Sequence, residues 1–332
     1  MAGAATFLMA QFLDWVAARP RRAAEARAAW ASTCPLNCAW EDALAEGLVA
    51  LTPGGGVVLT AAGRARRRAA MSGTSHDALI RDQFTRQATV FNSAAPIASE
   101  EALRMIVAAA APGPDDRVLD VACGGGLVAG AFAPHVRHAT GLDATPAMLD
   151  QARRAAAEKR LANTSWDEGE VTALPYPDAS FTIVVTRFSF HHFLDPLAAL
   201  REMVRVCAPG GRIVVADTCP AEDPDKAAAF NRLEKLRDPS HARALPLSEM
   251  KRLFAAAGLP EPQVRSYELR DEVKNLLARS FPNPGDEARI VAMFRQSAGD
   301  DSLGIPVRID GETIRYAYPV AILASARPAI VS

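Results

Sequence analysis

One glycine-rich run, Val118 to Gly130 (VLDVACGGGLVAG), constrains the fold of this chain more than any other feature. Its apolar first half predicts a buried strand, and the stretch that begins at Leu127 predicts a helix. Between them, Gly124, Gly125 and Gly126 have no Cβ atoms, so a ligand can approach the backbone of the turn closely. Free N–H groups at the start of the helix would face that ligand. The run therefore predicts an α/β fold with a ligand site at a strand-to-helix turn.

One acidic residue precedes these glycines and another follows them. Asp120 ends the predicted strand, where a carboxylate would repel a pyrophosphate but suit a cationic amino group. Asp143 ends the next short strand, His138 to Leu142, about 20 residues after Gly124, which is the spacing at which an acid binds ribose hydroxyls. The pattern therefore favours an adenosine-containing cofactor with a cationic end over a dinucleotide.

The turn resembles the first motif of the class I S-adenosylmethionine (SAM)-dependent methyltransferases, D-x-G-C-G-x-G, with Ala122 in place of the first glycine. Five further motifs of that family follow in order: Gly169–Asp178 (GEVTALPYPD), Ser180–Val185 (SFTIVV), Arg187–Phe193 (RFSFHHF), Leu200–Val206 (LREMVRV) and Pro209–Asp217 (PGGRIVVAD). The resemblance covers roughly residues 80 to 325. It is strongest to the branch with ubiquinone/menaquinone C-methyltransferases and many small-molecule O-methyltransferases.

This resemblance implies the fold and the cofactor. The fold is a Rossmann-like sheet of seven strands with the last one antiparallel, for which Val264 to Leu269 is the expected sixth strand. Ile305 to Ile309 and Thr313 to Leu323 are expected to form a closing hairpin. The cofactor is SAM, with Glu170 meeting the adenine amino group. The residues expected to bind it are Asp120, Ala122, Cys123, Gly124, Gly126, Asp143, Ala144, Met148, Glu170, Val171 and Arg187.

The residues after the predicted fourth strand face the sulfonium in this family and carry the candidate chemistry. Either His191 or His192 could be the general base, because the unperturbed pKa of imidazole lies near 6.5. Alternatively, one of them caps the next helix and the other packs. Arg187 could bind an anionic substrate group or pair with a core acid, and His241 is a third candidate base. No cluster of metal ligands is visible, so no metal site is expected.

Two helical segments are expected to flank the substrate. The stretch Leu79 to Phe91 resembles the lid helix of similar methyltransferases, although plain packing on the core is an alternative. An insertion, Asp225 to Gly258, follows the fifth strand. Both carry Leu, Met or Phe at helical spacing, which predicts a mainly apolar pocket with Phe84, Arg187 and His241 as substrate residues. We therefore expect methyl transfer to oxygen or carbon of a hydrophobic small molecule.

The first 70 residues differ in character from the rest. They predict three helical stretches, a hairpin around Thr52 to Gly56 (TPGGG) and a basic helix, Ala61 to Ala70, which together resemble a winged-helix unit in architecture. The expected organisation is a winged-helix-like domain over residues 1–70, linker and lid helices over 71–110 and the methyltransferase domain over 111–332. Within the second part, Met71 to Asp77 is expected to be a polar linker.

The basic N-terminal unit leaves two interpretations open. It could pack against a partner subunit in a homodimer, which we favour, or bind DNA through phosphate contacts. The second would make the chain a DNA-binding regulator with a SAM-fold sensor domain. A further alternative is a non-catalytic SAM-fold subunit, although the intact set of Asp120, Gly124, Gly126 and Asp143 argues against it.

Composition limits the class of protein and the kinds of site that the chain can form. A net charge of −1, 23% charged residues and 49% hydrophobic residues are ordinary for a globular protein. No apolar run approaches the ~20 residues that span a bilayer, and the start of the chain has no basic leader. The five cysteines fit a reducing compartment, so we expect a cytoplasmic protein. Cys34 and Cys38 have no second ligand pair nearby, which disfavours a zinc site.

Overall fold

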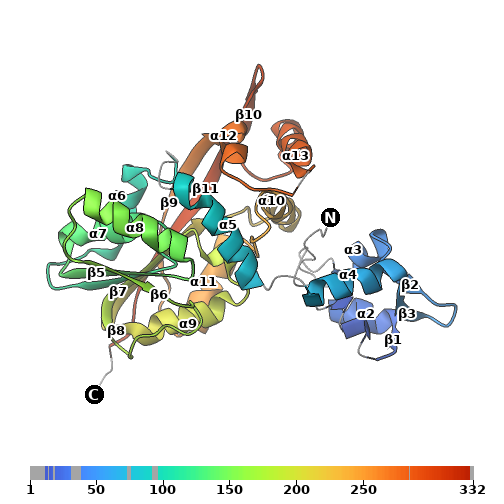
Figure 1. Ribbon diagram of the computed structural model, residues 1–332, viewed down its shortest axis with the longest axis horizontal. Coiled ribbons are helices and arrows are strands. Elements are labelled where there is room, and N and C mark those ends of the chain that lie inside the picture. Colours follow the sequence, from blue (N-terminus) through green and yellow to red (C-terminus); the bar gives the residue numbers. More distant parts are fainter. Residues whose placement is uncertain are drawn as a thin grey trace. The chain divides into compact units, whose positions relative to one another are not determined.

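The computed structural model describes residues 12–13, 15–17, 19–30, 39–72, 76–91, 96–283 and 285–329 of the chain. Its internal contacts divide the chain into two compact units, Met1–Leu79 and Ile80–Ser332 (Figure 1). Helix α5 (His76–Phe91) crosses the boundary between them. Among the described residues, no helix has the length and apolar character needed to cross a membrane.

The N-terminal unit contains a three-stranded antiparallel sheet in the order β1-β3-β2. Its elements are β1 (Arg21–Arg22), α2 (Ala23–Trp30), α3 (Ala39–Ala45), β2 (Val49–Leu51), β3 (Gly56–Leu59) and α4 (Ala61–Ser72). The expected hairpin forms because Gly55 adopts φ +74° and the amide of Gly56 donates to Oγ1 of Thr52 at 3.0 Å. The winged-helix interpretation of this unit stays a prediction.

A small apolar core holds this unit together. Phe12, Val16 and Trp40 are buried in it. Two residues of the predicted first helix, Phe7 and Leu8, lie outside the described residues, as do Cys34 and Cys38. At the other end of the unit, α4 continues through Ser72 and α5 begins at His76, so the expected linker is helical at both of its ends.

An eight-stranded sheet forms the centre of the larger unit. Its strands are β4 (Arg117–Val121), β5 (His138–Asp143), β6 (Thr164–Glu168), β7 (Phe181–Arg187), β8 (Cys207–Thr218), β9 (Gln263–Glu272), β10 (Val307–Asp310) and β11 (Thr313–Ala326). The path is β10-β11-β8-β7-β4-β5-β6, with β9 on the other edge of β11. Strands β4 to β8 pair in parallel, whereas β11 is antiparallel to β8, β9 and β10.

The predicted class of fold is confirmed, with one strand more than expected. The strands β6, β5, β4, β7, β8, β11 and β9 form the seven-stranded arrangement with an antiparallel last strand. The eighth strand, β10, is the first arm of the expected closing hairpin. Because the carboxyl ends of the parallel strands share one edge, the glycine turn after β4 and the residues after β7 and β8 lie at that edge.

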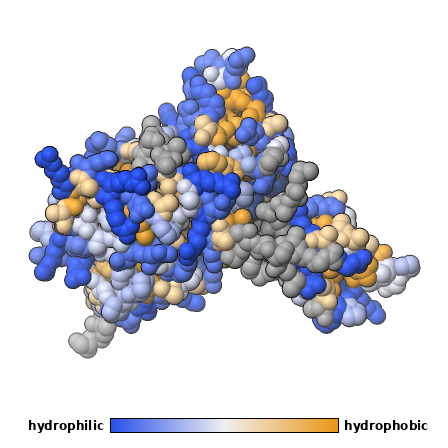
Figure 2. Space-filling model, in the orientation of Figure 1, coloured by the Kyte–Doolittle hydropathy of each residue, from blue (hydrophilic) through white to orange (hydrophobic). Residues whose placement is uncertain are grey.

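Helices cover both faces of this sheet (Figure 1). In chain order they are α6 (Glu100–Ala110), α7 (Leu127–Phe132), η1 (Ala133–His135), α8 (Pro146–Glu158), η2 (Phe190–His192), α9 (Pro196–Val206), α10 (Pro224–Arg237), α11 (Leu247–Ala256), α12 (Val273–Ala278) and α13 (Asp286–Asp300). Figure 2 shows hydrophobic residues near the end of the unit where β10 and α12 lie, and Ile309 of β10 is 42% exposed.

Alternation along the strands decides which face each side chain occupies. On β7, Ile183 and Val185 pack with α6 and α7, whereas Val184 packs with α9 and α11. By the same alternation, Arg187 continues the first series, so its side chain belongs to the α6/α7 face. Val118 of β4 packs on that face too, and Asp120 follows it by two residues.

A third apolar cluster packs the C-terminal helices of the unit against the sheet. It joins α10, α12 and α13 to β9 and β11 through residues such as Phe230, Leu276, Phe294 and Tyr318. Helices α12 and α13 are findings of the structure, since no pattern in the sequence had predicted them.

The indole of Trp166 of β6 leaves no room for a side chain at two glycine positions near the turn. A Cβ atom added to Gly126 would lie 2.5 Å from the indole, and one added to Gly141 would lie 2.6 Å from it. Real Cβ contacts do not approach so closely, so the indole fits only because both positions are glycine.

Candidate active site

Asp120 is the most unusual carboxyl group of the glycine turn. It is fully buried, and its Oδ2 atom accepts a hydrogen bond from the amide of Ala129 at 2.9 Å. Its Oδ1 atom is also buried but has no hydrogen-bond partner in the part of the chain that the structure describes. Burial raises the pKa of Asp120 to about 7, although the amide bond and the Arg187 guanidinium oppose the shift. An oxygen atom of this kind fits the ammonium group of a ligand.

Asp143 ties the end of β5 to the turn. Its Oδ2 atom accepts from the amide of Gly124 at 2.8 Å, and its Oδ1 atom accepts from the amide of Thr145 at 2.8 Å. Burial raises the pKa of this carboxyl group despite both bonds. A carboxylate has about four acceptor positions, so two amide bonds leave capacity for ribose hydroxyls.

The turn itself is left-handed at three positions. Ala122 has φ 55°, Gly124 has φ 49° and Gly126 has φ 77°. Glycine adopts this conformation without steric cost, whereas alanine does not. Ala122 therefore carries the strain of the position where the family has its first glycine.

The remaining predicted cofactor residues lie along the same edge. Cys123 and Met148 are buried, Ala144 is partly buried, and Val171 packs against the α9/α11 core. Glu170 accepts a hydrogen bond from Arg81 of α5 at 2.8 Å. The structure thus brings the predicted acids, the turn and helix α5 to one place.

A cavity of about 90 Å³ lies where the residues that follow β7 meet α5, α10 and α12. It is lined by Phe84, Gln87, Ile97, Phe188, His191, His192, Thr218, Glu234, Arg237, Asp238, Leu269, Leu276, Arg279, Tyr316 and Tyr318. These residues come from α5, η2, α10, α12 and the strands β8, β9 and β11 or from the loops beside them. Three predicted residues, Phe84, His191 and His192, are among them.

His191 and Asp217 form a buried pair in the wall of this cavity. Nδ1 of His191 lies 2.5 Å from Oδ1 of Asp217, which also accepts from the amide of Thr218 at 2.6 Å. Burial opposes protonation of His191, but the Asp217 carboxylate outweighs it and raises the pKa of His191. Because Nδ1 donates to the carboxylate, the neutral ring carries its lone pair on Nε2. None of the described residues hydrogen-bonds to Nε2.

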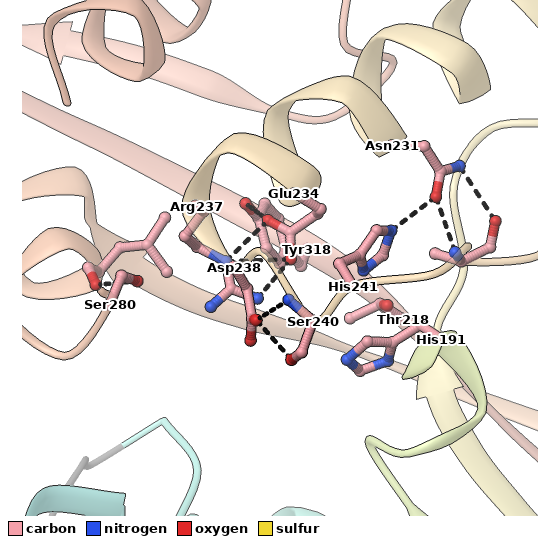
Figure 3. A network of polar contacts seen from close by, with 12 residues as sticks. His191, Thr218, Asn231, Glu234, Arg237, Asp238, Ser240, His241, Ser280 and Tyr318 are labelled. Carbon is pink, nitrogen blue, oxygen red and sulfur yellow. Dashed lines mark hydrogen bonds and ion pairs between the residues drawn. The ribbon is translucent and has the colours of Figure 1, made fainter. Parts of the chain in front are cut away.

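His192 and His241 have different environments (Figure 3 labels His191 and His241). Nδ1 of His192 lies 3.1 Å from the carbonyl oxygen of Ser240, and burial lowers the pKa of His192 to about 3. Nε2 of His241 lies 2.8 Å from Oδ1 of Asn231. Burial also lowers the pKa of His241 well below its usual range. Both rings are therefore neutral, and His241 is not among the described residues that line the cavity.

The cavity lining is mainly apolar, as expected, but the insertion contributes charged residues of α10 to it rather than apolar ones. Oε1 of Glu234 accepts from the hydroxyl of Tyr318 at 2.6 Å, and Oε2 accepts from Arg237 at 2.6 Å (Figure 3). Arg279 of the α12 end pairs with Asp271 and donates to the hydroxyl of Tyr316 at 3.3 Å. The apolar residues of the insertion instead pack into the core, as Phe230 and Leu233 do.

Arg187 also departs from its expected place beside the substrate. It is not among the described residues that line the cavity, and its side chain is 8% exposed. Nη1 donates to the carbonyl oxygen of Ile97 at 2.8 Å, and the guanidinium carbon lies 4.4 Å from the ring centre of Phe188. Phe188 has φ 53°, which is rare for a bulky residue and is typical of functional sites.

Sequence reasoning assigned no role to several residues of the site. They include Asp217, Thr218, Glu234, Arg237, Arg279, Tyr316 and Tyr318. Asp217 had a usable signal, because it ends the motif PGGRIVVAD, and alternation puts it on the face opposite Ala216. For the others, no motif marks the position.

Comparison with known proteins agrees with this geometry. A family model described as a methyltransferase domain matches residues 119–215. The demethylmenaquinone methyltransferase of Deinococcus radiodurans is 46% identical over 107 residues, which are 31% of this chain and 44% of that protein. The crystal structure of the cyclase SpnF is 17% identical with a TM-score of 0.53, over 77% of this chain and 98% of that chain. This last likeness concerns the fold alone.

A longer match comes from Bacillus subtilis (strain 168). The protein named uncharacterized methyltransferase YcgJ is 31% identical over 242 residues, which are 72% of this chain and 96% of that protein. The crystal structure of YcgJ has a TM-score of 0.64 and covers 69% of this chain and 98% of that chain. The chain therefore belongs to the class I methyltransferase family and is a SAM-dependent methyltransferase.

Proposed function

We propose that this enzyme transfers a methyl group to an acidic oxygen or carbon of a small molecule with a hydrophobic body, with His191 as general base. The observation that carries the proposal is the 2.5 Å contact between His191 and Asp217 in the wall of the cavity. A carboxylate that holds one imidazole nitrogen orients the ring and leaves the other nitrogen to take a proton.

The proposal includes where SAM binds. In this proposal Asp120 supplies an acceptor that no described residue partners for the ammonium group, Asp143 has acceptor positions for the ribose, and Glu170 receives the adenine amino group as the family resemblance implies. SAM supplies the electrophilic methyl group. The chain's own contribution is to hold the acceptor in line, and positioning of this kind can lower a barrier by roughly 7–11 kcal/mol.

The protonation state of His191 gives the reaction a pH dependence. Only the neutral ring can accept a proton at Nε2, and Asp217 raises the pKa at which the ring becomes neutral. The rate should therefore fall as the pH drops through this raised pKa. Neutral His192 instead shapes the cavity, since its ring packs edge-on against Phe84 with centres 5.0 Å apart.

The lining residues favour an acceptor with an apolar part and a polar part. Phe84, Ile97, Phe188, Leu269 and Leu276 offer contacts to a ring or chain. The name of the Deinococcus radiodurans relative, a demethylmenaquinone methyltransferase, gives independent support for a hydrophobic acceptor. Homodimerisation through the N-terminal unit, a cytoplasmic location and the absence of a nucleic-acid substrate stay predictions from the sequence.

A labelled-methyl screen tests the function. The purified chain is incubated with methyl-labelled SAM and a small-molecule extract, and the labelled product is identified by mass. On that substrate His191→Ala should lower kcat by about 10²- to 10⁴-fold, while calorimetry shows unchanged binding of S-adenosylhomocysteine (SAH). His192→Ala is the matched control, with a smaller loss. Wild-type turnover by His191→Ala would exclude His191 as the base.

A further inference from the structure

Arg187 and Asp120 are two buried, oppositely charged groups whose bonding is incomplete. Among the described residues, Nε and Nη2 of Arg187 have no hydrogen-bond partner, and neither has Oδ1 of Asp120. Arg187 is 8% exposed and Asp120 is 0% exposed. Buried charged groups without partners are rare, because their desolvation is not offset.

The two groups face the same side of the sheet but do not touch. They end the adjacent strands β7 and β4, and alternation puts both on the α6/α7 face. On β7 the register partner of Asp120 is Val185, two residues before Arg187, so the two groups lie near each other at the ends of neighbouring strands, and the charge of Arg187 opposes the rise in the pKa of Asp120. Yet they form no ion pair, since Oδ2 of Asp120 bonds to Ala129 and Nη1 of Arg187 bonds to Ile97. The pair therefore offers one acceptor atom and two donor atoms that no described residue partners.

Tyr267 adds a third donor at this place. Its hydroxyl is buried without a well-formed hydrogen bond to any described residue, and the neighbouring Arg187 acts most strongly against the rise in its pKa caused by burial. Tyr267 belongs to β9, on the far side of the sheet order from β4. Three elements thus direct unpartnered polar atoms at one buried region.

We propose that Arg187 and Tyr267 form the receptor for the α-carboxylate of SAM and of its product SAH, opposite the Asp120 carboxylate that receives the α-ammonium group. The inference rests on the SAM position proposed above. The zwitterionic amino acid end of SAM supplies partners for both buried charges at once. Its carboxylate accepts hydrogen bonds from the guanidinium and the phenol, and its ammonium group donates to Asp120.

Charge explains why the cofactor, rather than the acceptor, is the ligand of Arg187. A cation near a sulfonium would repel it, unless a carboxylate of the same molecule lies between them. Arg187 also shares a face with Asp120, whereas His191 pairs with Asp217 on the opposite face of β8. An anion bound at Arg187 is therefore part of the cofactor site.

Three ligands that differ only at the amino acid end test the proposal by calorimetry. They are SAH, decarboxylated SAH (the 3-aminopropyl thioether of 5′-deoxyadenosine) and 5′-methylthioadenosine, which lacks both charges. At about pH 8.5, which keeps the carboxyl group of Asp120 ionised, wild type should bind SAH roughly 10- to 100-fold more tightly than decarboxylated SAH.

Arg187→Met should remove this preference, to within about threefold, and leave the affinity for 5′-methylthioadenosine unchanged. Arg187→Lys should restore part of it, and Tyr267→Phe should reduce it by a smaller factor. Arg212→Met is the matched control, because Arg212 lies on the neighbouring strand but pairs with Asp116. It should keep the full preference.

Two results would overturn the proposal: no preference for SAH in wild type, or an undiminished preference in Arg187→Met. If Arg187→Met does not fold, the wild-type ratio and Tyr267→Phe still decide. Failure of the SAM position itself would look different, because Asp143→Ala would then leave the affinity for all three ligands unchanged.

Discussion

The proposed cofactor side and the proposed substrate side of this enzyme lie at one edge of one sheet but are built in different ways. The first comes from one stretch, from Asp120 to Glu170, and its buried acid Asp120 keeps an oxygen without a partner among the described residues. The substrate side joins residues from Phe84 to Tyr318, and its buried acids Asp217 and Glu234 are bonded. On this proposal, a buried acid with an unpartnered oxygen marks a place where a ligand binds. A buried acid that is already hydrogen-bonded instead orients a catalytic ring before the substrate arrives.

On ligand affinity, the largest effect should come from the cofactor side. Asp143→Ala removes the acceptor proposed for the ribose hydroxyls, and it also frees the amides of Gly124 and Thr145. We expect a loss of about 1.5–3 kcal/mol in SAH binding, or roughly 10- to 150-fold in Kd. Calorimetry measures it, with His191→Ala as the control from the other side. Equal affinity in wild type and Asp143→Ala would remove Asp143 from the cofactor side.

A smaller effect should appear in stability on the substrate side. The folded-state pKa of His191 is raised above 6.5, so its contribution is fully present below about pH 6.5 and is lost as the pH rises through the raised value. Asp217 has a folded-state pKa below 3.8, so its contribution is present above about pH 3.8 and is lost as the pH falls through the lowered value. The pair therefore stabilises most between these limits.

Urea denaturation of wild type and Asp217→Asn across pH 4 to 9 measures this window. The variant should be less stable by about 1–2 kcal/mol near pH 5, and the difference should shrink at alkaline pH. A difference that grows with pH would contradict the pairing. His192→Asn is a suitable control, because its ring is neutral over the whole range.

The smallest effect should come from relieving strain in the turn. Ala122→Gly removes a Cβ atom from a position with φ 55°, although glycine also gains freedom in the unfolded chain. We expect a net stabilisation of about 0.5–1 kcal/mol, seen as a higher Tm. Ala155→Gly, inside helix α8, should lower the stability by a similar amount. A lower Tm for Ala122→Gly would mean that the alanine methyl packs usefully.

The structure agrees best with the sequence where geometry is local. It brings Gly124 and Asp143 together as expected, because a strand, a turn and the next strand fix their spacing, and their role in binding SAM stays a proposal. The pair of His191 and Asp217 could not be predicted, because it depends on which strand lies beside β7. From the sequence, His191 and His192 were therefore equal candidates for the general base, and only the order of the strands shows which of them pairs with an acid.

The prediction that apolar residues of the insertion line the pocket failed for a related reason. Helical spacing predicted a helix there, and α10 is present. It did not reveal that Phe230 and Leu233 face the core while Glu234 and Arg237 face the cavity. Periodicity identifies the faces of a helix, but only its neighbours decide which face meets the substrate.

The fit of the Trp166 indole constrains how three positions of this sequence can change during evolution. Because Gly126 and Gly141 each leave room for the same ring, the three positions cannot drift independently. A lineage that keeps the tryptophan inherits both glycines, and a side chain can enter at Gly141 only after the ring has become smaller. The order of substitutions is thus constrained, in the sense of epistasis. A relative with tryptophan at the first position and a side chain at either glycine would contradict this dependence.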